Sequence, residues 1–506
     1  MSGKVWLVGA GPGDPGLITA RGIEVLSQAE VVLHDALSHP ALLELCPNAE
    51  VRDVGKRFGE RYSALQDSIT EQLIELGRAG KRVVRLKGGD PFMFARGSEE
   101  AIGLARAGIP FEIVPGISAP VAASAYAGIS LTHRDLSSSV TFITGSDRAG
   151  KEWSPEAWKK LATATDTICV LMGMRRIEEI TRAIIEGGRA GTTPAAVIQW
   201  GARPEQRVLT STLARIADES RAQGLTNPAV ILIGDVVTLR EEIRWFDTQP
   251  LFGKRLLLPR PKQQAQASAR AIRERAAEPV VFPVIEIVEP PDPERLRRAA
   301  SELGSYDWVL FTSANGVERL FAALDALGLD ARAFGRAGVG VIGPKTAEAL
   351  RQRGVRADVL AEEFVGEGLA EAVLARGVGR RVLLARALEA RDTLPDLLRR
   401  AGAEVDVVAA YQTVPVGSEQ GRILEDLIEG GKLDVVLFTS SSTVDSVVRL
   451  LGARAGELLS RVTLASIGPI TSRTLSVHGL HAAVTAERYT VEGLLNALEH
   501  HYEPIS

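Results

Sequence analysis

Hydrophobic and polar positions follow two different periods along the 506 residues. Short runs rich in Val, Ile and Leu, at 82–86, 166–172, 228–234 and 255–259, are typical of buried strands. Amphipathic stretches with helical spacing lie between them. A chain that alternates strands and helices in this way is expected to form an α/β fold with mostly parallel sheets. Its length suggests three or four domains of ordinary size.

The second half of the chain contains an internal repeat. Residues 307–321, DWVLFTSANGVERLF, align without gaps with 434–448, DVVLFTSSSTVDSVV, and 338–373 resemble 462–498. Each copy has the pattern of a strand, a Thr-Ser turn, a helix, a strand, a Gly-Pro turn and a helix. We therefore predict two similar α/β lobes that face each other across a cleft.

Both kinds of turn in the repeat stand where a strand ends and a helix begins. Ser313 and Ser440 have the position and chemistry of N-caps, and Pro344 and Pro469 suit the first turn of a helix. Taken singly, these residues need be no more than caps. Taken as a set that points into one cleft, the turns would present free helix N-termini, which attract carboxylates.

The composition excludes several classes of function. With 45% hydrophobic residues, 24% charged residues and a net charge of -4, no general attraction to nucleic acid is expected. Cys46 and Cys169 are too few for a disulfide framework, and no Cys/His cluster has metal-ligand spacing. No segment has the pattern of a signal peptide or a membrane span. We expect a soluble cytoplasmic protein that acts without a metal.

The chain opens with an apolar run at 5–8 that leads into the glycine turn 9–14, GAGPGD. A dinucleotide-binding fingerprint would need a third glycine where Asp14 stands, and Pro12 removes an N–H that would cradle a pyrophosphate. A nicotinamide site is therefore disfavoured. The turn still follows a strand, and open α/β sheets bind ligands at the carboxyl ends of their strands.

Four segments of the first half together resemble the tetrapyrrole methylase family, most closely uroporphyrinogen III C-methyltransferases. They are GAGPGDPGLIT (9–19), VVRLKGGDPFMFARG (83–97), PGISA (115–119) and GISLTHRD (128–135), and they occur in the order that the family has. The resemblance covers about residues 3 to 246. It implies two α/β lobes, at about 1–115 and 116–246, that enclose S-adenosylmethionine (SAM) as the methyl donor.

Carried over position by position, the resemblance implies the site residues of the first half. Asp90 could accept from a ribose hydroxyl or the amino group of SAM, or could simply cap its own turn. Met93 departs from the family pattern, in which an aliphatic residue is common. Asp35 and Lys56 would handle a proton and Arg134 would contact the substrate, although Asp35 and Lys56 could also be surface or capping charges. The implied SAM contacts are Pro12, Gly88, Gly89, Asp90, Met93, Ser118, Ala119, Met172 and Gly201.

The repeat in the second half resembles uroporphyrinogen III synthase over about residues 254 to 500, with looser motifs. The matching pieces are FTSANGV (311–317), IGPKTAEAL (342–350), AAYQT (409–413) and IGPITSRTL (467–475). That enzyme closes linear hydroxymethylbilane while it inverts the last pyrrole and removes water. The reaction needs a cleft that holds a molecule with eight carboxylates in one conformation, more than it needs acid–base help.

The resemblance to the synthase also implies substrate contacts. Tyr411 could steady the departing hydroxyl or could be an ordinary residue at a strand end. Arg260, Lys345, Arg386 and Arg391 could pair with substrate carboxylates, although each is more readily interpreted as a solvated surface charge. Hydroxyls and helix-start amides would come from Thr312, Ser313, Asn315, Gly343, Thr346, Thr439, Ser440, Ser442, Gly468 and Thr471.

Domain boundaries follow from the linker composition and from the two resemblances. Pro250 and Gly253 lie in the segment that separates the two well-patterned halves. We predict a first half at 1–246, a linker at 247–253 and a second half at 254–506. Discontinuous lobes are implied for the second half, lobe one being 254–285 with 415–506 and lobe two 290–410, with crossing strands at 281–291 and 407–416.

Together the two resemblances predict a bifunctional enzyme, because the synthase makes the compound that the methyltransferase consumes. The product would be precorrin-2, for siroheme or cobalamin, and the partners would be small tetrapyrroles and a second copy of the chain, bound through the first half. Two alternatives stay open. The methylase could act on a later cobalamin precursor, or the second half could only bind a tetrapyrrole, although its turns are intact in both copies.

Overall fold

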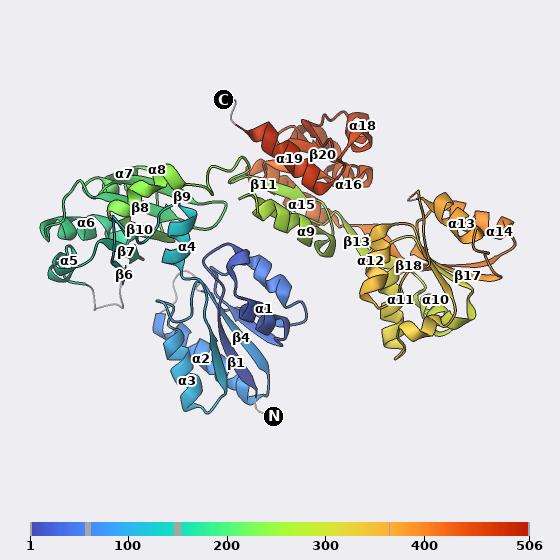
Figure 1. Cartoon of the computed structure of the whole chain (residues 1–506), viewed down its shortest axis with the longest axis horizontal. Helices are drawn as coiled ribbons and strands as arrows, with labels where there is room; N and C mark the ends of the chain where they lie inside the picture. Colours follow the sequence, from blue (N-terminus) through green and yellow to red (C-terminus); the bar gives the residue numbers. More distant parts are fainter. Residues whose placement is uncertain (1–2, 56–61, 146–152, 364, 504–506) are drawn as a thin grey trace. The chain divides into compact units, whose positions relative to one another are not determined.

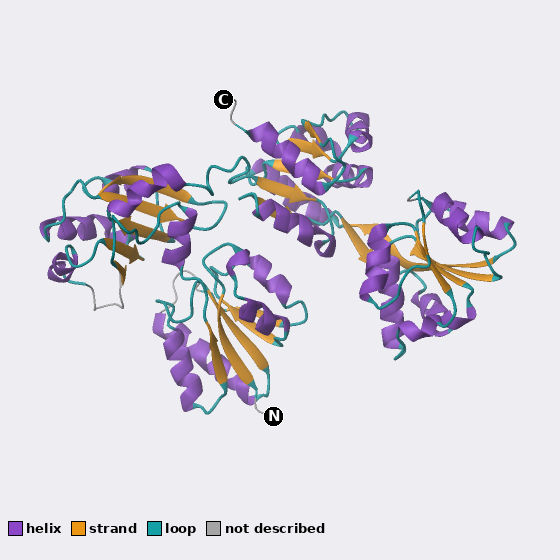
Figure 2. Cartoon of the chain, viewed as in Figure 1, coloured by secondary structure: helices purple, strands orange, loops and turns teal. Residues whose placement is uncertain are grey.

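The computed structural model describes residues 3–55, 62–145, 153–363 and 365–503. The described chain forms four sheets, each of which is accompanied by helices, as the alternating pattern predicts (Figure 1). Figure 2 shows the same alternation by type of element. By compactness the chain divides into two units, Met1–Leu256 with Ala269–Pro279 and Leu495–Ser506, and Leu257–Ser268 with Val280–Leu494.

The first sheet has the strand order β3-β2-β4-β1-β5, and all neighbouring strands are parallel. Side chains alternate along the inner strand β1, because Val5 and Leu7 pack in one buried cluster and Val8 in another. Both faces are therefore covered, as parallel sheets require. The elements are β1 (Lys4–Gly9), α1 (Ala20–Ser27), β2 (Val31–His34), β3 (Glu50–Asp53), α2 (Tyr62–Arg78), β4 (Arg82–Lys87), α3 (Gly97–Arg106) and β5 (Phe111–Val114).

The second sheet has the order β6-β7-β10-β8-β9 and is mixed. Only β6 and β7 are parallel, whereas β10 runs antiparallel to both β7 and β8, and β9 to β8. The expectation of mostly parallel sheets is wrong for this one, because a buried apolar run such as 228–234 carries no sign of its direction. The elements are α4 (Ala119–Tyr126), β6 (Val140–Thr144), α5 (Pro155–Leu161), β7 (Thr167–Leu171), α6 (Ile177–Glu186), β8 (Pro194–Gln199), β9 (Arg207–Thr212), α7 (Ile216–Ala222), β10 (Ala229–Ile233) and α8 (Arg240–Ile243).

The third sheet, β12-β11-β19-β20-β21, contains the second copy of the repeat. Its strands β19, β20 and β21 are parallel, and a helix follows each of them. The elements are β11 (Arg255–Leu258), α9 (Lys262–Arg273), β12 (Glu278–Val281), α15 (Ser418–Glu429), β19 (Val435–Phe438), α16 (Ser441–Leu451), α17 (Ala455–Leu459), β20 (Thr463–Ser466), α18 (Pro469–Val477), β21 (Val484–Thr485) and α19 (Val491–Tyr502).

The fourth sheet, β13-β18-β17-β14-β15-β16, contains the first copy of the repeat. Its strands from β18 to β16 are parallel, and β13 pairs antiparallel with the long strand β18. The elements are β13 (Ile285–Val288), α10 (Pro293–Ser301), β14 (Trp308–Phe311), α11 (Ala314–Ala326), β15 (Gly338–Val341), α12 (Pro344–Gln352), β16 (Val359–Leu360), α13 (Gly366–Leu374), β17 (Arg381–Ala387), α14 (Thr393–Arg400) and β18 (Glu404–Pro415).

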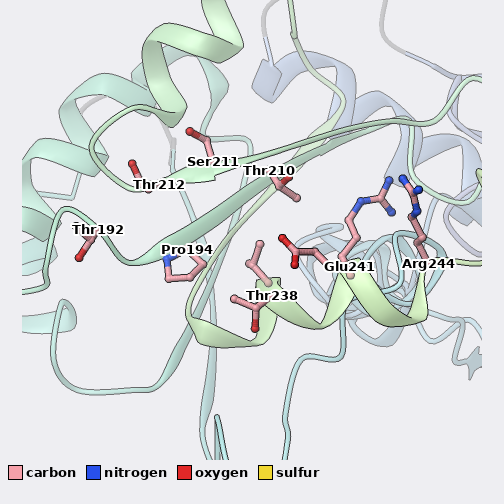
Figure 3. A pocket seen from close by; sticks show the side chains of 10 residues that line it. Thr192, Pro194, Thr210, Ser211, Thr212, Thr238, Glu241 and Arg244 are labelled. Carbon is pink, nitrogen blue, oxygen red and sulfur yellow. The ribbon is translucent and has the colours of Figure 1, made fainter.

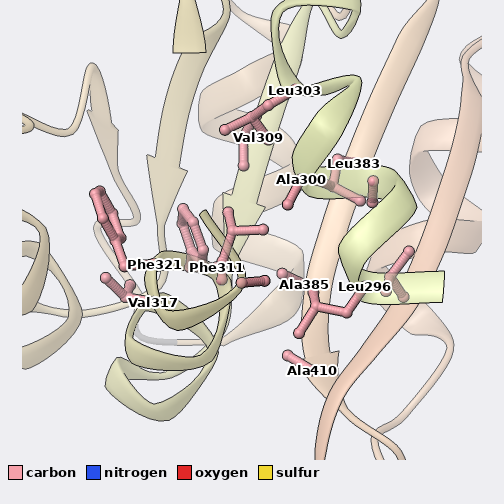
Figure 4. Packing of buried hydrophobic residues seen from close by; sticks show 14 of the residues in the cluster. Leu296, Ala300, Leu303, Val309, Phe311, Val317, Phe321, Leu383, Ala385 and Ala410 are labelled. Atoms are coloured by element: carbon pink, nitrogen blue, oxygen red, sulfur yellow. The ribbon is translucent and has the colours of Figure 1, made fainter. Parts of the chain in front are cut away.

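The core of this fourth sheet holds its strand ends in place. Phe311 of β14 and Ala385 of β17 pack with Leu296 of α10 and Val317 of α11 in one buried cluster (Figure 4). Full burial of a side chain such as Phe311 contributes about 1.5–3 kcal/mol to stability. The cluster fixes the carboxyl ends of β14 and β17, where the predicted substrate residues of this lobe begin.

The helix starts of the repeat agree with the sequence prediction. Ser313 caps α11 by accepting from the Gly316 N–H at 3.2 Å, and Ser440 caps α16 by accepting from the Thr443 N–H at 3.3 Å. Pro344 and Pro469 occupy the first turns of α12 and α18. The capping roles predicted for these four positions are confirmed.

Candidate functional site

Three glycine turns of the first half meet backbone to backbone. Gly11 and Gly89 form an isolated bridge, with the Gly89 N–H 2.9 Å from the Gly11 carbonyl and the Gly11 N–H 3.2 Å from the Gly89 carbonyl. A Cβ on Gly9 would lie 2.5 Å from the Gly116 Cα, and one on Gly116 would lie 2.4 Å from the Gly89 carbonyl oxygen. Only glycine fits at these contacts, so the turns at 9–13, 88–90 and 115–118 form one surface.

Asp90 links two of these turns. Its Oδ2 accepts from the Gly116 N–H at 3.0 Å and its Oδ1 accepts from the Phe92 N–H at 2.8 Å. The turn-capping role that we considered for Asp90 is therefore present. Because each carboxylate oxygen can accept more than one hydrogen bond, Asp90 can make these bonds and contact a ligand at the same time.

A fourth loop brings Gly201 to the same place. A Cβ on Gly201 would lie 2.4 Å from the Cβ of Ala123 in α4, so the loop lies directly on that helix. A Cβ on Gly13 would meet the Ala202 carbonyl at 2.9 Å, so the loop also contacts the opening turn. Ser118 precedes α4 as its N-cap residue but makes no side-chain capping bond. The start of α4 at Ser118 and Ala119 thus lies next to Gly89, and Gly201 lies against the same helix at Ala123.

Strained backbone concentrates around the predicted SAM residues. Met172 has φ +54°, Trp200 and Ala202 on either side of Gly201 have φ +53° and +62°, and Phe94 beside Met93 has φ +57°. Left-handed conformations of such residues cost energy and persist at functional sites, where the surrounding structure holds them. This strain supports the predicted site without reference to any motif.

Asp35 lies beside the turn 88–90, which is predicted to contact SAM, and is held by a buried arginine. Its Oδ1 accepts from Nη2 of Arg85, and its Oδ2 accepts from the Gly88 N–H at 3.4 Å. The side chain of Asp35 is 31% exposed, whereas that of Arg85 is 2% exposed. An ionised carboxylate in this position can accept a proton from a molecule bound next to Gly88.

Behind Asp35 lies a buried cluster of charges that the sequence analysis missed. Oε1 of the fully buried Glu100 accepts from Arg85 Nε at 3.2 Å, from Lys87 Nζ at 3.0 Å and from Gln66 Nε2 at 2.9 Å. Burial, and then the nearby Arg85, lower the pKa of Lys87. Burial opposes the charge of Arg85 too, but Asp35 and Glu100 raise its pKa above the ordinary value. Arg85 and Lys87, two cations within the otherwise apolar run 83–87, were the available signal.

Two other charged residues, Lys56 and Arg134, were predicted for the first half. Lys56 lies outside the described residues. Arg134 is exposed, in a turn that the His133 N–H closes by donating to the Ser137 carbonyl at 2.9 Å. Within the described residues no hydrogen bond or ion pair connects Arg134 to the glycine turns.

In the second half, Tyr411 and Ser313 come together in the fourth sheet. The Tyr411 hydroxyl lies 3.0 Å from Ser313 Oγ, and Tyr411 is 7% exposed. Tyr411 lies within β18 and joins the core cluster of the sheet, so it is not at a strand end. Thr312 and Asn315 are half-buried in the same turn, and a Cβ on Gly343 would have no atom within 4 Å.

The third sheet has a matching group of residues at the ends of β19 and β20. Ser440 Oγ lies 3.0 Å from Ser442 Oγ, and Thr439 directly precedes them. A Cβ on Gly468 would lie 2.9 Å from the Tyr489 ring. Thr346 and Thr471, at equivalent positions of the two copies, are 5% and 4% exposed and thus offer the least side-chain surface of the predicted set.

The four basic residues predicted near substrate carboxylates differ in their surroundings. Lys345 and Arg391 are exposed. Arg386 is not a solvated charge, because it is 7% exposed and donates to Asp392 Oδ1 and to the Arg391 carbonyl, both at 2.5 Å. Arg260 is half-buried, and its Nε donates to Thr439 Oγ1 at 2.7 Å.

A separate cavity of about 570 Å³ lies in the second sheet (Figure 3). Threonine and serine hydroxyls of β9 line it together with Thr238, Glu241 and Arg244, the last two from α8 and the residue that follows it. None of the predicted site residues lines this cavity. The SAM prediction therefore rests on the glycine turns and not on this cavity.

Among the residues that the structure describes, no group of three or more His, Cys, Asp or Glu side chains could hold a metal ion. Over the same ranges, no helix is both long and apolar enough to cross a bilayer.

Comparison with known proteins assigns both halves. The profile of Tetrapyrrole (Corrin/Porphyrin) Methylases matches residues 4–217, and that of Uroporphyrinogen-III synthase HemD matches 266–496. The porphyrin biosynthesis protein HemD of Ruminiclostridium josui is 37% identical over 498 residues, which are 98% of this chain and 97% of the relative.

Two other matches cover the chain in part. Siroheme synthase 1 of Yersinia enterocolitica is 51% identical over 249 residues, which are 49% of this chain and 52% of the relative, so the chain spans about half of that protein. A structure of uroporphyrin III C-methyltransferase from Thermus thermophilus complexed with S-adenyl homocysteine is 35% identical, covers 47% of this chain and 99% of that one, and has a TM-score of 0.40. The chain belongs to the tetrapyrrole methylase family in its first half and to the uroporphyrinogen-III synthase family in its second.

Proposed function

We propose that this chain closes hydroxymethylbilane to uroporphyrinogen III in its second half and methylates that product twice in its first half, giving precorrin-2. The observation that carries the proposal is the presence of both families in one chain, matched at both halves by a relative over nearly the full length. The two reactions are consecutive, so the product of one half is the substrate of the other. This favours uroporphyrinogen III over a later cobalamin precursor as the methyl acceptor.

The residues of the first half fit SAM as the methyl donor. Gly88 and Gly89 leave space for a ligand against their backbone, since a Cβ on either would meet no atom closer than 3.6 Å. Ser118 has a hydroxyl that caps nothing, and Met172 offers an apolar side chain that is 40% exposed. Bound SAM would supply an electrophilic methyl group on a sulfonium. Turn 88–90, Ser118, Met172 and Gly201 would hold it next to Asp35.

The chain's own task in methyl transfer is to position the substrate and remove a proton. A pyrrole ring of a porphyrinogen is already electron-rich, and correct positioning can lower the barrier by about 7–11 kcal/mol in the best models. Asp35 is the group that we propose to take up the proton. Arg85 and the Gly88 N–H fix the direction of its carboxylate, and Arg85 compensates its charge.

The second half needs to hold a flexible polyanion rather than to activate it. Helix N-termini at Ser313, Gly343, Ser440 and Gly468 follow the ends of strands in both copies of the repeat. Their free N–H groups and positive dipole ends can bind carboxylates. The Tyr411 hydroxyl, next to Ser313, could donate to the hydroxyl that leaves the substrate. We propose that this half is an active synthase and not only a binding module.

The test is to supply hydroxymethylbilane to the full chain with and without SAM and to separate the products by chromatography. Without SAM we expect uroporphyrinogen III, and with SAM we expect precorrin-2. Formation of only uroporphyrinogen I, the isomer without inversion, would contradict the synthase activity. Uroporphyrinogen III that accumulates unmethylated with SAM present would contradict the methyltransferase activity.

The predicted homodimer remains a proposal that rests on the resemblance of the first half. Light scattering coupled to size-exclusion chromatography tests it. A mass near 108 kDa, twice the 54.1 kDa of one chain, would support it. A mass of one chain at all concentrations would contradict it.

A further inference from the structure

The two copies of the repeat extend beyond the segments that align in sequence. In the fourth sheet, β17 lies next to β14, which is followed by β15 and β16, and in the third sheet β11 lies next to β19, which is followed by β20 and β21. Since β14 and β19 are the aligned strands, β17 and β11 hold the same place. In the sequence, β17 follows the aligned segment of its copy, whereas β11 precedes the aligned segment of its copy. Sequence alignment therefore does not pair the two strands.

Each of these two equivalent strands has an arginine at its carboxyl end. Arg386 is the penultimate residue of β17, and Arg260 follows β11 by two residues. The hydrogen bond from Arg260 to Thr439, which directly follows β19, shows that the carboxyl ends of β11 and β19 lie together. Both arginines therefore stand where the helices of their lobe begin.

The two arginines differ in how their charge is compensated. Arg386 forms an ion pair with Asp392 and also donates to a carbonyl, so its lobe neutralises it internally. Arg260 has only the neutral Thr439 hydroxyl as a partner, and no carboxylate within the described ranges pairs with it. Burial lowers the pKa of Arg260, and no neighbouring charge offsets that effect. A half-buried guanidinium without a counter-ion is costly, and an anionic ligand would relieve that cost.

The free donors of Arg260 suit a carboxylate. A guanidinium has five N–H donors, and here only Nε–H is used, which leaves the two terminal nitrogens for a bidentate contact. The same edge of the sheet has the starts of α16 and α18, whose N–H groups also favour anions. Thr439 fixes the plane of the guanidinium.

We propose that Arg260 is a substrate-positioning residue that binds one carboxylate of hydroxymethylbilane in the third sheet. Its counterpart Arg386 cannot take this role, because its guanidinium is already paired with Asp392. The inference rests on the proposed synthase activity and goes beyond it. Binding one side chain of the linear tetrapyrrole at a fixed point would favour the folded conformation in which the last ring inverts. Arg260 touches substrate without taking part in bond making.

The experiment compares Arg260→Gln, Arg260→Lys and Arg449→Gln in ring closure by the full chain. Loss of a charged hydrogen-bonded pair predicts a rise in KM for hydroxymethylbilane of about 10- to 100-fold in Arg260→Gln, with a smaller change in kcat. Arg260→Lys keeps the charge and should recover part of the affinity. Arg449, exposed in the last turn of α16 at the far end from Ser440, is the matched control and should keep the wild-type KM.

Two further readouts separate a substrate contact from a structural role. Higher ionic strength should raise the KM of the wild type more than that of Arg260→Gln, because the variant has already lost the charge pair. The share of uroporphyrinogen I should also rise in Arg260→Gln. A wild type that forms uroporphyrinogen III beside an Arg260→Gln variant with unchanged KM and isomer ratio would overturn this inference alone. A wild type without ring closure would overturn the proposed function, and this inference with it.

Discussion

The predicted sites of the two halves of this chain are formed by different kinds of groups. In the first half, Gly9, Gly89 and Gly116 approach so closely that a Cβ on Gly9 or Gly116 would collide with backbone. In the second half, Gly343 could carry a Cβ without meeting any atom within 4 Å, and the predicted site consists of helix starts and hydroxyls. The first site is thus shaped by backbone contact, and the second by groups that several residue types could supply.

This difference explains why the motifs of the two halves differ in strength. A backbone-to-backbone contact accepts only glycine, as at Gly9 and Gly116, so the segments around these two residues are distinctive in sequence. A helix N-terminus that binds carboxylates needs only a suitable cap, and Ser313 and Ser440 are among several residue types that provide one. Substitutions should therefore act abruptly in the first half and gradually in the second.

The largest effect is expected from Gly89→Trp. The side chain would fill the place where backbone should meet SAM, so SAM affinity measured by calorimetry should fall by about 100-fold or more. Gly108→Trp is the matched control, because Gly108 has nearly the same φ, +68° against +70°, but open space around it. Ring closure of hydroxymethylbilane should be unaffected in both. Normal SAM affinity in Gly89→Trp would mean that the glycine turns are not the SAM site.

The next effect is expected from Asp35→Asn. The amide keeps the shape but cannot take up a proton, so methylation should slow by about 100-fold or more while SAM binds normally. Asp166→Asn is the control, since Asp166 accepts from Ser138 and Ser139 ahead of β7 and is not among the predicted site residues. Full methylation by the Asp35→Asn variant would reduce Asp35 to a structural residue.

Much of this arrangement was accessible from sequence, and the exceptions have physical causes. The caps at Ser313 and Ser440 and the α/β class follow from local patterns, and the structure agrees. The antiparallel course of β10 was missed because burial on both faces leaves a strand no pattern that reveals direction.

The sequence also did not reveal which charged side chains have a counter-ion, because this depends on contacts in the fold and not on residue type. In the sequence Arg260 and Arg386 look alike, yet only Arg386 has a carboxylate partner in the described structure. Arg85 and Lys87 of β4 pair with Glu100 of α3, and this contact joins residues that are well separated in the sequence. The positive φ of Met172 could not be predicted either, because the residue at this position is not a glycine.

A moderate effect is expected from Tyr411→Phe. Removing one hydrogen bond near the leaving hydroxyl should slow ring closure by about 3- to 100-fold and increase the share of uroporphyrinogen I. Gly343→Trp, which fills the space before α12, should do more harm. Tyr306→Phe is the control, because its buried hydroxyl bonds to Asp406 at 2.8 Å in the same lobe. If Tyr411→Phe abolished the inverted isomer while Gly343→Trp left it intact, Tyr411 would be an obligatory catalyst and not part of a template.

The smallest effect is expected from Ser440→Ala. The change removes the cap that accepts from the Thr443 N–H, which should lower the free energy of unfolding by about 1 kcal/mol. It also removes one hydroxyl from the predicted substrate surface, but the N–H groups at the start of α16 remain. Ring closure should therefore slow only a few-fold, since the backbone donors carry most of the proposed carboxylate binding.

Asp292→Ala separates the two contributions of Ser440. Asp292 caps α10 by accepting from the Arg295 N–H at 3.2 Å and is not among the predicted substrate residues. Its loss should destabilise the chain by a similar amount in urea unfolding but leave the KM for hydroxymethylbilane unchanged. A few-fold rise in KM confined to Ser440→Ala would assign the hydroxyl to substrate binding. A loss of ring closure as abrupt as the loss of SAM binding in Gly89→Trp would instead show that the second site tolerates no more change than the first, and the contrast between the two halves would fail.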